Sequence, residues 1–341
     1  MKRFLLTLLK SLPALILLTA CGSSDRPFTL KGHFRHLQSG DFYVYSTDPT
    51  WQGFDTVHVD EGRFRYSRPI TDTLVLTIQY PNFMQMQVIV APGKTTTIKG
   101  DANNLLETRI GGLEDNELLS DFRKSLGKQG IQAGQSRAEE FIRNHPASFA
   151  SVALLQRYFL ATRDIDYARA ERLLKLMMKA APHRTITKSL RAQLSQLAQC
   201  APGRPLPSFS AVTEKGDSVT DKTFRGKNLV IWFWAMWSAD MKYPVIHVAQ
   251  YLKKHPDRLQ ALNICLDADT AALHQTIKHD SLRGHIVCDR QEWNSPLVRS
   301  FGVRDVPSAI LVDTAGTVIA RDLNEEALGK ELERLGIKNK D

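Results

Sequence analysis

The chain has 341 residues, of which 43% are hydrophobic and 24% are charged, and it carries a formal charge of +9. This composition is typical of a globular protein, excludes a disordered or collagen-like chain, and the length suffices for two domains. Basic residues are interspersed with acidic ones and form no aromatic-basic motif, so we expect no nucleic-acid partner.

The one long apolar stretch is at the start, where Lys2 and Arg3 precede a run from Phe4 to Leu18. Its basic flank and short length are those of a signal peptide and not of a membrane-spanning helix. Small residues then lead directly to Cys21, an order that resembles the bacterial lipobox. We therefore predict a signal peptide over residues 1–20, lipidation of Cys21 and a membrane partner reached through that lipid anchor.

This leader predicts a lipoprotein of the cell envelope whose folded part faces the periplasm or the cell surface. Gly22, and not an aspartate, follows Cys21, which slightly favours the outer membrane. The envelope is oxidising, so the remaining thiols, at Cys200, Cys265 and Cys288, can form disulfides there. Three thiols cannot all pair within one chain.

Residues 21–115 contain short segments in which apolar and polar residues alternate. Examples are Phe42-Tyr43-Val44-Tyr45, Leu74-Val75-Leu76-Thr77-Ile78 and Gln85-Met86-Gln87-Val88-Ile89-Val90. Alternation with period two at regular spacing predicts strands of a small β-sandwich or barrel. From 116 to 200 the apolar residues recur at helical spacing, so this segment is predicted to be a helical connector.

Residues 203–341 alternate strand patterns with helix patterns. The run 228–235 is apolar throughout, as in a central strand buried on both faces. A second strand is predicted over 259–266, a short one over 285–288, and a closing hairpin over 308–320. The whole chain is thus predicted to be multidomain α+β, with a β-rich front, a helical connector and an α/β domain at the end.

Six motifs of this last domain resemble the thioredoxin-like domains of the TlpA and ResA type, in the AhpC/TSA-related superfamily. In chain order they are Pro205-Leu206-Pro207-Ser208-Phe209, Gly216-Asp217, Phe224-Arg225-Gly226-Lys227-Asn228, Phe233-Trp234-Ala235-Met236-Trp237, Phe301-Gly302-Val303-Arg304-Asp305-Val306-Pro307 and Leu311-Val312-Asp313-Thr314-Ala315-Gly316. The strand-rich front resembles, more weakly, a small domain of unknown function that often precedes such modules. The resemblance implies a thioredoxin fold for residues 203–341.

In that family the strand ending Phe-Trp-Ala-x-Trp delivers a Cys-x-x-Cys pair to a helix amino terminus, which stabilises the attacking thiolate. Here Ser238 and Met241 occupy the two cysteine positions. A hydroxyl and a thioether cannot form the mixed disulfide, so the ordinary dithiol cycle cannot run there. Ser238 has no base tied to it in sequence, and we interpret it or Asp240 as a helix cap and not as a nucleophile.

Val306-Pro307 matches the family position at which a cis proline presents a backbone edge to bound polypeptide. The resemblance therefore implies a cis peptide bond there and a peptide-binding groove between Trp237 and Pro307, which could remain although the chemistry has gone. A polypeptide partner is predicted on this basis. No cofactor and no metal site is predicted, because the histidines and cysteines lack the spacing of ligands.

Cys265 and Cys288 lie near the carboxyl ends of two strands that the resemblance places side by side. They are a relocated redox pair, a structural disulfide, or two small core residues, since free cysteines are usually buried. Adjacent parallel strands rarely offer good disulfide geometry, which weighs against a bond. Cys200 is interpreted as a lone buried thiol or an intermolecular contact.

Two functions follow from these features. The first is a redox-inactive thioredoxin-like lipoprotein that binds a polypeptide or envelope partner. The alternative is a thiol–disulfide oxidoreductase, or a peroxide-handling enzyme, that uses Cys265 and Cys288 in place of the lost pair. The sequence favours the first, because both positions of the family dithiol lack sulfur nucleophiles. It specifies neither the partner nor the oligomeric state.

Overall fold

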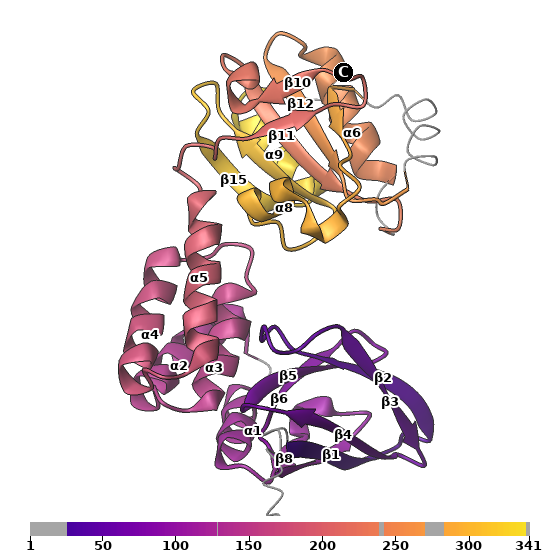
Figure 1. Cartoon of the computed structure of the whole chain (residues 1–341), viewed down its shortest axis with the longest axis vertical. Coiled ribbons are helices and arrows are strands. Elements are labelled where there is room, and N and C mark those ends of the chain that lie inside the picture. Colours follow the sequence, from indigo (N-terminus) through magenta and orange to yellow (C-terminus); the bar gives the residue numbers. More distant parts are fainter. Residues whose placement is uncertain (1–25, 128, 239–241, 270–282, 339–341) are drawn as a thin grey trace, which may run out of the picture. The chain divides into compact units, whose positions relative to one another are not determined.

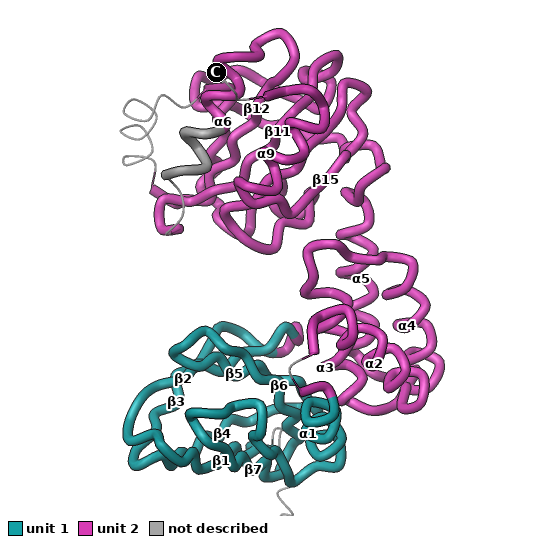
Figure 2. The backbone as a smooth tube through the Cα atoms, turned by 180° about the vertical axis from the view of Figure 1, so that it is seen from behind, with its two compact units in different colours: residues 1–47, 51–125 teal, residues 48–50, 126–341 magenta. Residues whose placement is uncertain are grey.

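The computed structural model describes residues 26–127, 129–238, 242–269 and 283–338, with only the backbone described over 242–247. The predicted signal peptide, Cys21, Asp240 and Met241 lie outside the described residues. The chain divides into two compact units, which we describe separately. The first holds residues 1–47 and 51–125, and the second holds 48–50 and 126–341 (Figure 2).

The first unit is one curved sheet of eight strands in the order β6-β5-β2-β3-β4-β1-β7-β8. The strands are β1 (Arg26–Arg35), β2 (Ser39–Tyr45), β3 (Phe54–Asp60), β4 (Arg63–Ile70), β5 (Leu74–Gln79), β6 (Gln85–Val90), β7 (Thr95–Asp101) and β8 (Arg109–Gly111). The sheet curls until it is nearly closed (Figure 1), which corresponds to the barrel and not to the sandwich of the prediction.

Alternation along the strands fills the interior of this barrel. Phe28, Leu30 and Phe34 of β1 are at most 1% exposed and belong to one apolar core, and the residues that alternate with these positions face outward. Gly32 takes the remaining inward position because the Phe64 ring lies across it: a Cβ there would sit 2.6 Å from that ring. Period-two burial thus turns the amphipathic pattern of the sequence into a barrel core.

Helix α1 (Glu114–Leu126) packs on this sheet. The buried Asn116 side chain donates to the Ile89 carbonyl oxygen at 2.7 Å and accepts from the Ile89 N–H at 2.8 Å. Ser120 of the same helix accepts from the Ile110 N–H at 3.1 Å. The first compact unit therefore reaches residue 125, beyond the limit of 115 that the change of periodicity indicated.

The second unit begins with a bundle of helices. They are α2 (Ile131–Asn144), α3 (Phe149–Leu155), the π-helical turn η2 (Gln156–Leu160), α4 (Tyr167–Ala180) and α5 (Thr185–Gln199). Their buried apolar positions repeat at helical spacing, for example Leu173, Leu174 and Met177 of α4. Among the described residues no helix is long and apolar enough to cross a membrane.

The rest of the second unit is a thioredoxin-like α/β domain. After a hairpin of β9 (Ser210–Val212) and β10 (Ser218–Thr220), five strands form a sheet in the order β13-β12-β11-β14-β15. They are β11 (Asn228–Trp234), β12 (Leu259–Cys265), β13 (His285–Val287), β14 (Ser308–Val312) and β15 (Val318–Leu323). Helices α6 (Lys242–Lys254), α8 (Pro296–Phe301) and α9 (Glu325–Arg334) complete the described part.

Strand β11 is central and buried on both faces, as its apolar run predicts. Leu229, Ile231 and Phe233 belong to one apolar core, and Val230, Trp232 and Trp234 belong to another. Strands β11, β12 and β13 run parallel, while β14 is antiparallel to β11. The carboxyl ends of β11, β12 and β13 and the amino end of β14 therefore meet at one edge of the sheet.

Candidate active site

The edge where these strand ends meet gathers most of the described residues that the sequence singled out. β11 leads to Trp237 and Ser238, β12 ends at Cys265, β13 is followed by Cys288, and Pro307 precedes β14. Ser238 Oγ donates to the Val306 carbonyl oxygen at 3.3 Å, so the degenerate dithiol position touches the proline loop. The Val306–Pro307 peptide bond is cis, as the resemblance implied.

The Ser238 side chain contacts the loop that holds Pro307. The helix that follows the motif, α6, is described only from Lys242, and the turn that Ser238 was expected to cap lies partly outside the described residues. The Trp237 side chain is 57% exposed and its ring centroid lies 6.3 Å from that of Trp293, which is 42% exposed. This aromatic pair is a surface on which an apolar side chain of a bound chain can pack.

Cys265 and Cys288 lie next to each other. Ile264 pairs with Val287 in the parallel ladder, so the following residues on the two strands, Cys265 and Cys288, are adjacent as well. Neighbouring strands are about 4.8 Å apart, which is within the Cα separation that a disulfide spans. Cys288 is the first residue beyond β13, so the ladder does not fix it as it fixes an interior strand residue. Both are free thiols in this structure.

Asp267 joins the two thiols, and the sequence-based prediction missed it. The Cys265 Sγ lies 3.0 Å from Asp267 Oδ2, and the Cys288 Sγ lies 3.3 Å from the Asp267 carbonyl oxygen. The carboxylate also accepts the Met236 N–H at 2.8 Å and is 7% exposed. The signal available in the sequence was an acidic residue two positions after a strand-ending cysteine.

The two thiols have opposite pKa shifts. A hydrogen bond from the Cys265 thiol lowers the pKa of Cys288 to about 7, and the backbone N–H of Arg290 contributes in the same direction. The pKa of Cys265 is raised by its hydrogen bond to Cys288, by burial and by the Asp267 carboxylate. A single proton is thus held on Cys265 while Cys288 ionises, which is the arrangement of an attacking and a resolving thiol.

The thiol with the lower pKa, Cys288, is also the more exposed of the two. Cys265 is 2% exposed, whereas Cys288 is partly exposed. Only Cys288 can be reached by a bulky substrate in this arrangement. Cys200 is different: it is fully buried at the end of α5, and burial raises its pKa to about 11. Of its two sequence interpretations, the structure favours the lone buried thiol.

Comparisons with known proteins agree with this fold. The model of the AhpC/TSA family matches residues 202–321, and that of a domain of unknown function, DUF4369, matches residues 28–119. The thiol-disulfide oxidoreductase ResA of Bacillus thuringiensis subsp. konkukian is 24% identical over 133 residues, which cover 38% of this chain and 74% of the relative.

Solved structures of similar proteins include several from the genus Bacteroides. A thiol-disulfide oxidoreductase from Bacteroides fragilis is 29% identical, covering 39% of this chain and 99% of that one, with a TM-score of 0.36. A thioredoxin-like protein from Bacteroides caccae is 14% identical, covering 60% of this chain and 78% of that one, with a TM-score of 0.46. Residues 202–321 thus form a thioredoxin-like domain of the AhpC/TSA family, similar to thiol–disulfide oxidoreductases, behind a DUF4369 domain.

Proposed function

We propose that the thioredoxin-like domain is a thiol–disulfide oxidoreductase whose dithiol is Cys265 and Cys288. The observation that carries the proposal is the hydrogen-bonded thiol pair with opposite pKa shifts at the active edge of the sheet. The similarity to ResA supports it, because that relative is named as a thiol-disulfide oxidoreductase. The alternative function of the sequence analysis is therefore preferred to the redox-inactive one.

Cys288 is the nucleophile of the proposed reaction. Its thiolate attacks one sulfur of a substrate disulfide, so that a mixed disulfide forms. The substrate S–S bond breaks, and the leaving sulfur takes the electron pair and a proton from water. The pKa of about 7 suits this step, because a thiol that attacks best has a pKa near the ambient pH.

Cys265 resolves the mixed disulfide. Its proton passes to the Asp267 carboxylate 3.0 Å away, and its sulfur attacks Cys288 Sγ. The second substrate thiol leaves with a proton, and Cys265 and Cys288 are joined as a disulfide. The substrate gains two electrons and two protons, which the two thiols lose. The reverse sequence oxidises a dithiol substrate.

The test is a redox titration in buffers of reduced and oxidised dithiothreitol, followed by acid quenching, alkylation and peptide mass spectrometry. We expect Cys265 and Cys288 to leave and regain the alkylated state together, with one midpoint. Cys288→Ser abolishes reduction of a disulfide-bonded peptide, and Cys265→Ser accumulates the mixed disulfide at Cys288. Cys200→Ser is the matched control, since its thiol lies outside the pair, and it keeps the activity.

Independent titration of the two thiols, or full activity of Cys288→Ser, would contradict the proposal. The remaining function would then be binding without redox chemistry. Trp237 precedes Ser238, which contacts the proline loop, and its exposed ring lies near that of Trp293, so capture of a polypeptide there would be the next experiment.

A further inference from the structure

The outer face of the first unit carries a cationic cluster that the proposed function does not use. Strands β4, β1 and β7 are neighbours in the sheet, and β8 follows β7. Arg63, His33, Lys99 and Arg109 form one cross-strand row, because His33 pairs with Arg63 and with Lys99, and Lys99 pairs with Arg109. All four side chains are exposed.

A second row lies two residues along the strands. Lys31 pairs with Arg65 on one side and with Thr97 on the other. Lys31 and Arg65 are both exposed. Residues that pair directly have their Cβ atoms about 5 Å apart, so the pairs Lys31–Arg65 and Lys99–Arg109 place like charges where they repel each other. We call the six residues Lys31, His33, Arg63, Arg65, Lys99 and Arg109 the cationic face.

Acidic residues neutralise this face only at its margins. In the described part of the chain, none of the six makes an ion pair with a carboxylate. Asp60 is paired opposite Arg63 at one end of the first row. In the second row Thr97 pairs with Gly111, and a Glu117 oxygen lies 4.0 Å from where a Cβ on Gly111 would sit. Asp101, next along β7, is already bound by Arg35 and His36.

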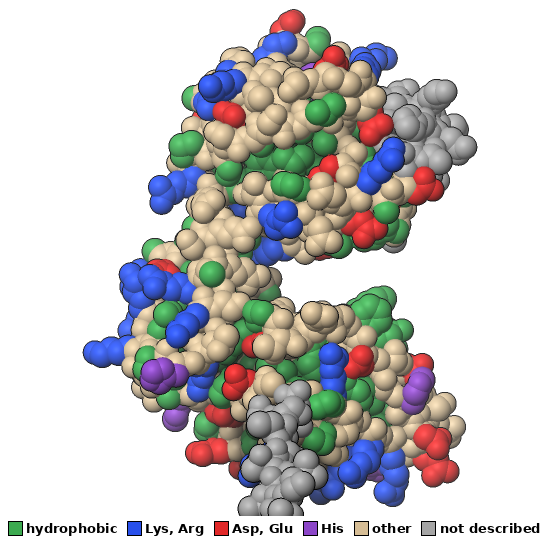
Figure 3. Space-filling model, in the orientation of Figure 1, with side chains coloured by type: hydrophobic (Ala, Val, Ile, Leu, Met, Phe, Trp, Pro, Cys, Tyr) green, Lys and Arg blue, Asp and Glu red, His purple; other side chains and the backbone are tan. Residues whose placement is uncertain are grey.

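Protection of a sheet edge does not explain these charges. Lysines on edge strands often prevent pairing with other chains, and only Arg109 lies on an edge strand, β8. The other five residues lie on β4, β1 and β7, which are interior strands. Figure 3 shows Lys and Arg side chains gathered at the lower part of the first unit, where Figure 1 draws β1 and β4. The repulsion is therefore a cost that a bound anion would relieve.

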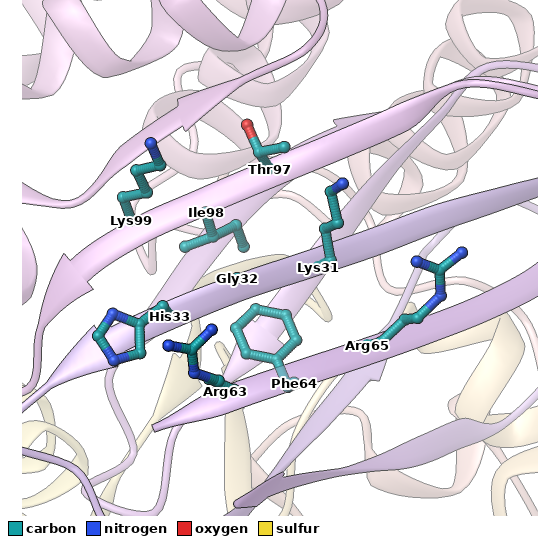
Figure 4. A pocket seen from close by; sticks show the side chains of 9 residues that line it. All are labelled: Lys31, Gly32, His33, Arg63, Phe64, Arg65, Thr97, Ile98 and Lys99. Atoms are coloured by element: carbon teal, nitrogen blue, oxygen red, sulfur yellow. The ribbon is translucent and has the colours of Figure 1, made fainter. Parts of the chain in front are cut away.

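A hollow of about 350 Å³ lies between the two rows. It is lined by Lys31, His33, Arg63, Arg65, Thr97 and Lys99, together with the middle residues Gly32, Phe64 and Ile98 (Figure 4). Phe64 and Ile98 belong to the barrel core, so their side chains lie below the face. Cationic groups therefore ring a hollow large enough for a phosphate-bearing headgroup.

We propose that the cationic face binds the anionic phospholipid surface of a membrane and takes a headgroup phosphate into this hollow. The connectivity favours a membrane over a soluble anion. β1 begins at Arg26, five residues after Cys21, so an extended connection reaches at most about 18 Å. Lipidation of Cys21, which stays a prediction, would hold the strand that bears Lys31 and His33 beside the headgroups.

The test uses the mature chain from residue 22, made without lipid, and co-sedimentation with vesicles. We expect binding to vesicles of phosphatidylcholine mixed equally with phosphatidylglycerol, and not to phosphatidylcholine alone. Binding should fall at about 1 M salt, where charges are screened within about 3 Å. Each cation near an anionic surface contributes about fivefold in affinity, so Lys31→Gln with Lys99→Gln weakens binding about thirtyfold.

The matched control is Lys179→Gln with Lys188→Gln, two exposed lysines on α4 and α5 that remove the same charge elsewhere. It should retain binding within about twofold, because those lysines lie outside the proposed contact. Equal losses in the two double variants would overturn the proposal, since net charge alone would then explain the binding. Equal binding to neutral vesicles would overturn it too. A chain that binds inorganic phosphate or polyphosphate but does not bind anionic vesicles would also overturn the proposal. That result would identify a soluble anion as the ligand.

Discussion

At the scale of single residues, the Cys288 thiol is set apart by its hydrogen bond from Cys265. That bond is the main cause of its lowered pKa, and it opposes burial and the negative charges of Glu214 and Asp267. Alkylation of Cys288 in the reduced chain should therefore rise about tenfold per pH unit and level off above about pH 7. Iodoacetamide labelling followed by peptide mass spectrometry measures this profile.

The pH profile of Cys288 alkylation should be compared between the parent chain and Cys265→Ala. Removing the donor destabilises the Cys288 thiolate, so the midpoint should move upward, towards the ordinary thiol value of 9.0. Cys200 is an internal control in every sample, because its pKa of about 11 and its burial keep it unlabelled near neutral pH. An unchanged midpoint in Cys265→Ala would mean that the thiol pair does not control Cys288.

Sequence and structure agree unevenly at this scale. The cis bond at Pro307 and the loss of the dithiol were predictable from residues in a family motif. The neighbourhood of Cys265 and Cys288 was predictable only in outline, because register between strands depends on packing that sequence patterns do not fix. Asp267 was missed, since its role depends on the turn that returns its carboxylate to Cys265.

At the scale of elements, the packing of β1 in the barrel depends on the absence of a side chain at Gly32. A Cβ on Gly32 would lie 2.5 Å from the Ile98 carbonyl oxygen as well as 2.6 Å from the Phe64 ring. Gly32→Ala should therefore destabilise the first unit by about 1 to 3 kcal/mol, as other overpacked core sites do. Hydrogen exchange of peptides from residues 26–101 in rising urea measures the loss.

Gly40→Ala is the matched control for Gly32→Ala. Gly40 lies in β2 of the same sheet, and nothing comes within 4 Å of a Cβ built there. Its effect should stay within about 0.5 kcal/mol. Equal destabilisation by both alanines would show that lost backbone freedom in strands, and not crowding under Phe64, determines the result.

The cationic face was predictable from the sequence only in part. Arg63 and Arg65, like Lys31 and His33, alternate with inward residues, so the sequence shows that each strand is basic on one side. It does not show that these strands are neighbours. β1 pairs with β7 in parallel across a long stretch of chain, and only that pairing aligns Lys99 with His33. Nonlocal pairing of this kind is what single-strand patterns leave open.

At the scale of the whole molecule, the helices of the second unit are joined to the thioredoxin-like domain by two arginines, of which Arg321 is buried and Arg304 half-buried. Arg321 of β15 is 6% exposed and donates to the carbonyl oxygens of Leu197 at 3.2 Å and Gly302 at 2.7 Å. The Leu197 carbonyl belongs to the last turn of α5, where a positive charge is favourable. Arg304 donates to the carbonyl oxygens of Leu160 and Thr162, and to Asp322 at 2.7 Å.

Sequence periodicity divided this region into a connector and a domain, and it did not predict these joints. Arg304 and Arg321 occupy positions in the family domain, yet the carbonyl groups that they bind in the helical region lie more than a hundred residues earlier in the chain. A buried arginine recognises carbonyl groups through geometry that no local pattern encodes. The helices and the α/β domain accordingly fall into one compact unit.

Arg321→Met tests this joint. Methionine keeps much of the apolar volume but removes the arginine donor from the Gly302 carbonyl group and one cation from Asp322. Among the described residues, the Leu197 carbonyl group keeps only the Cys200 N–H as donor. We expect a loss of about 3 to 5 kcal/mol in the free energy of unfolding, measured with urea. Arg172→Met, an exposed arginine of α4, should change it by about 0.5 kcal/mol or less.

Alkylation of Cys200 shows whether the stability is lost at this joint. It is fully buried at the end of α5, and the positive charge of Arg321 lowers its pKa against the larger effect of burial. Removing Arg321 therefore raises the pKa of Cys200 further, which by itself slows alkylation. If Arg321→Met nevertheless labels faster than the parent chain, the thiol has become accessible through opening of the joint. Slower labelling with an undiminished free energy of unfolding would show that Arg321 does not hold the helices to the domain.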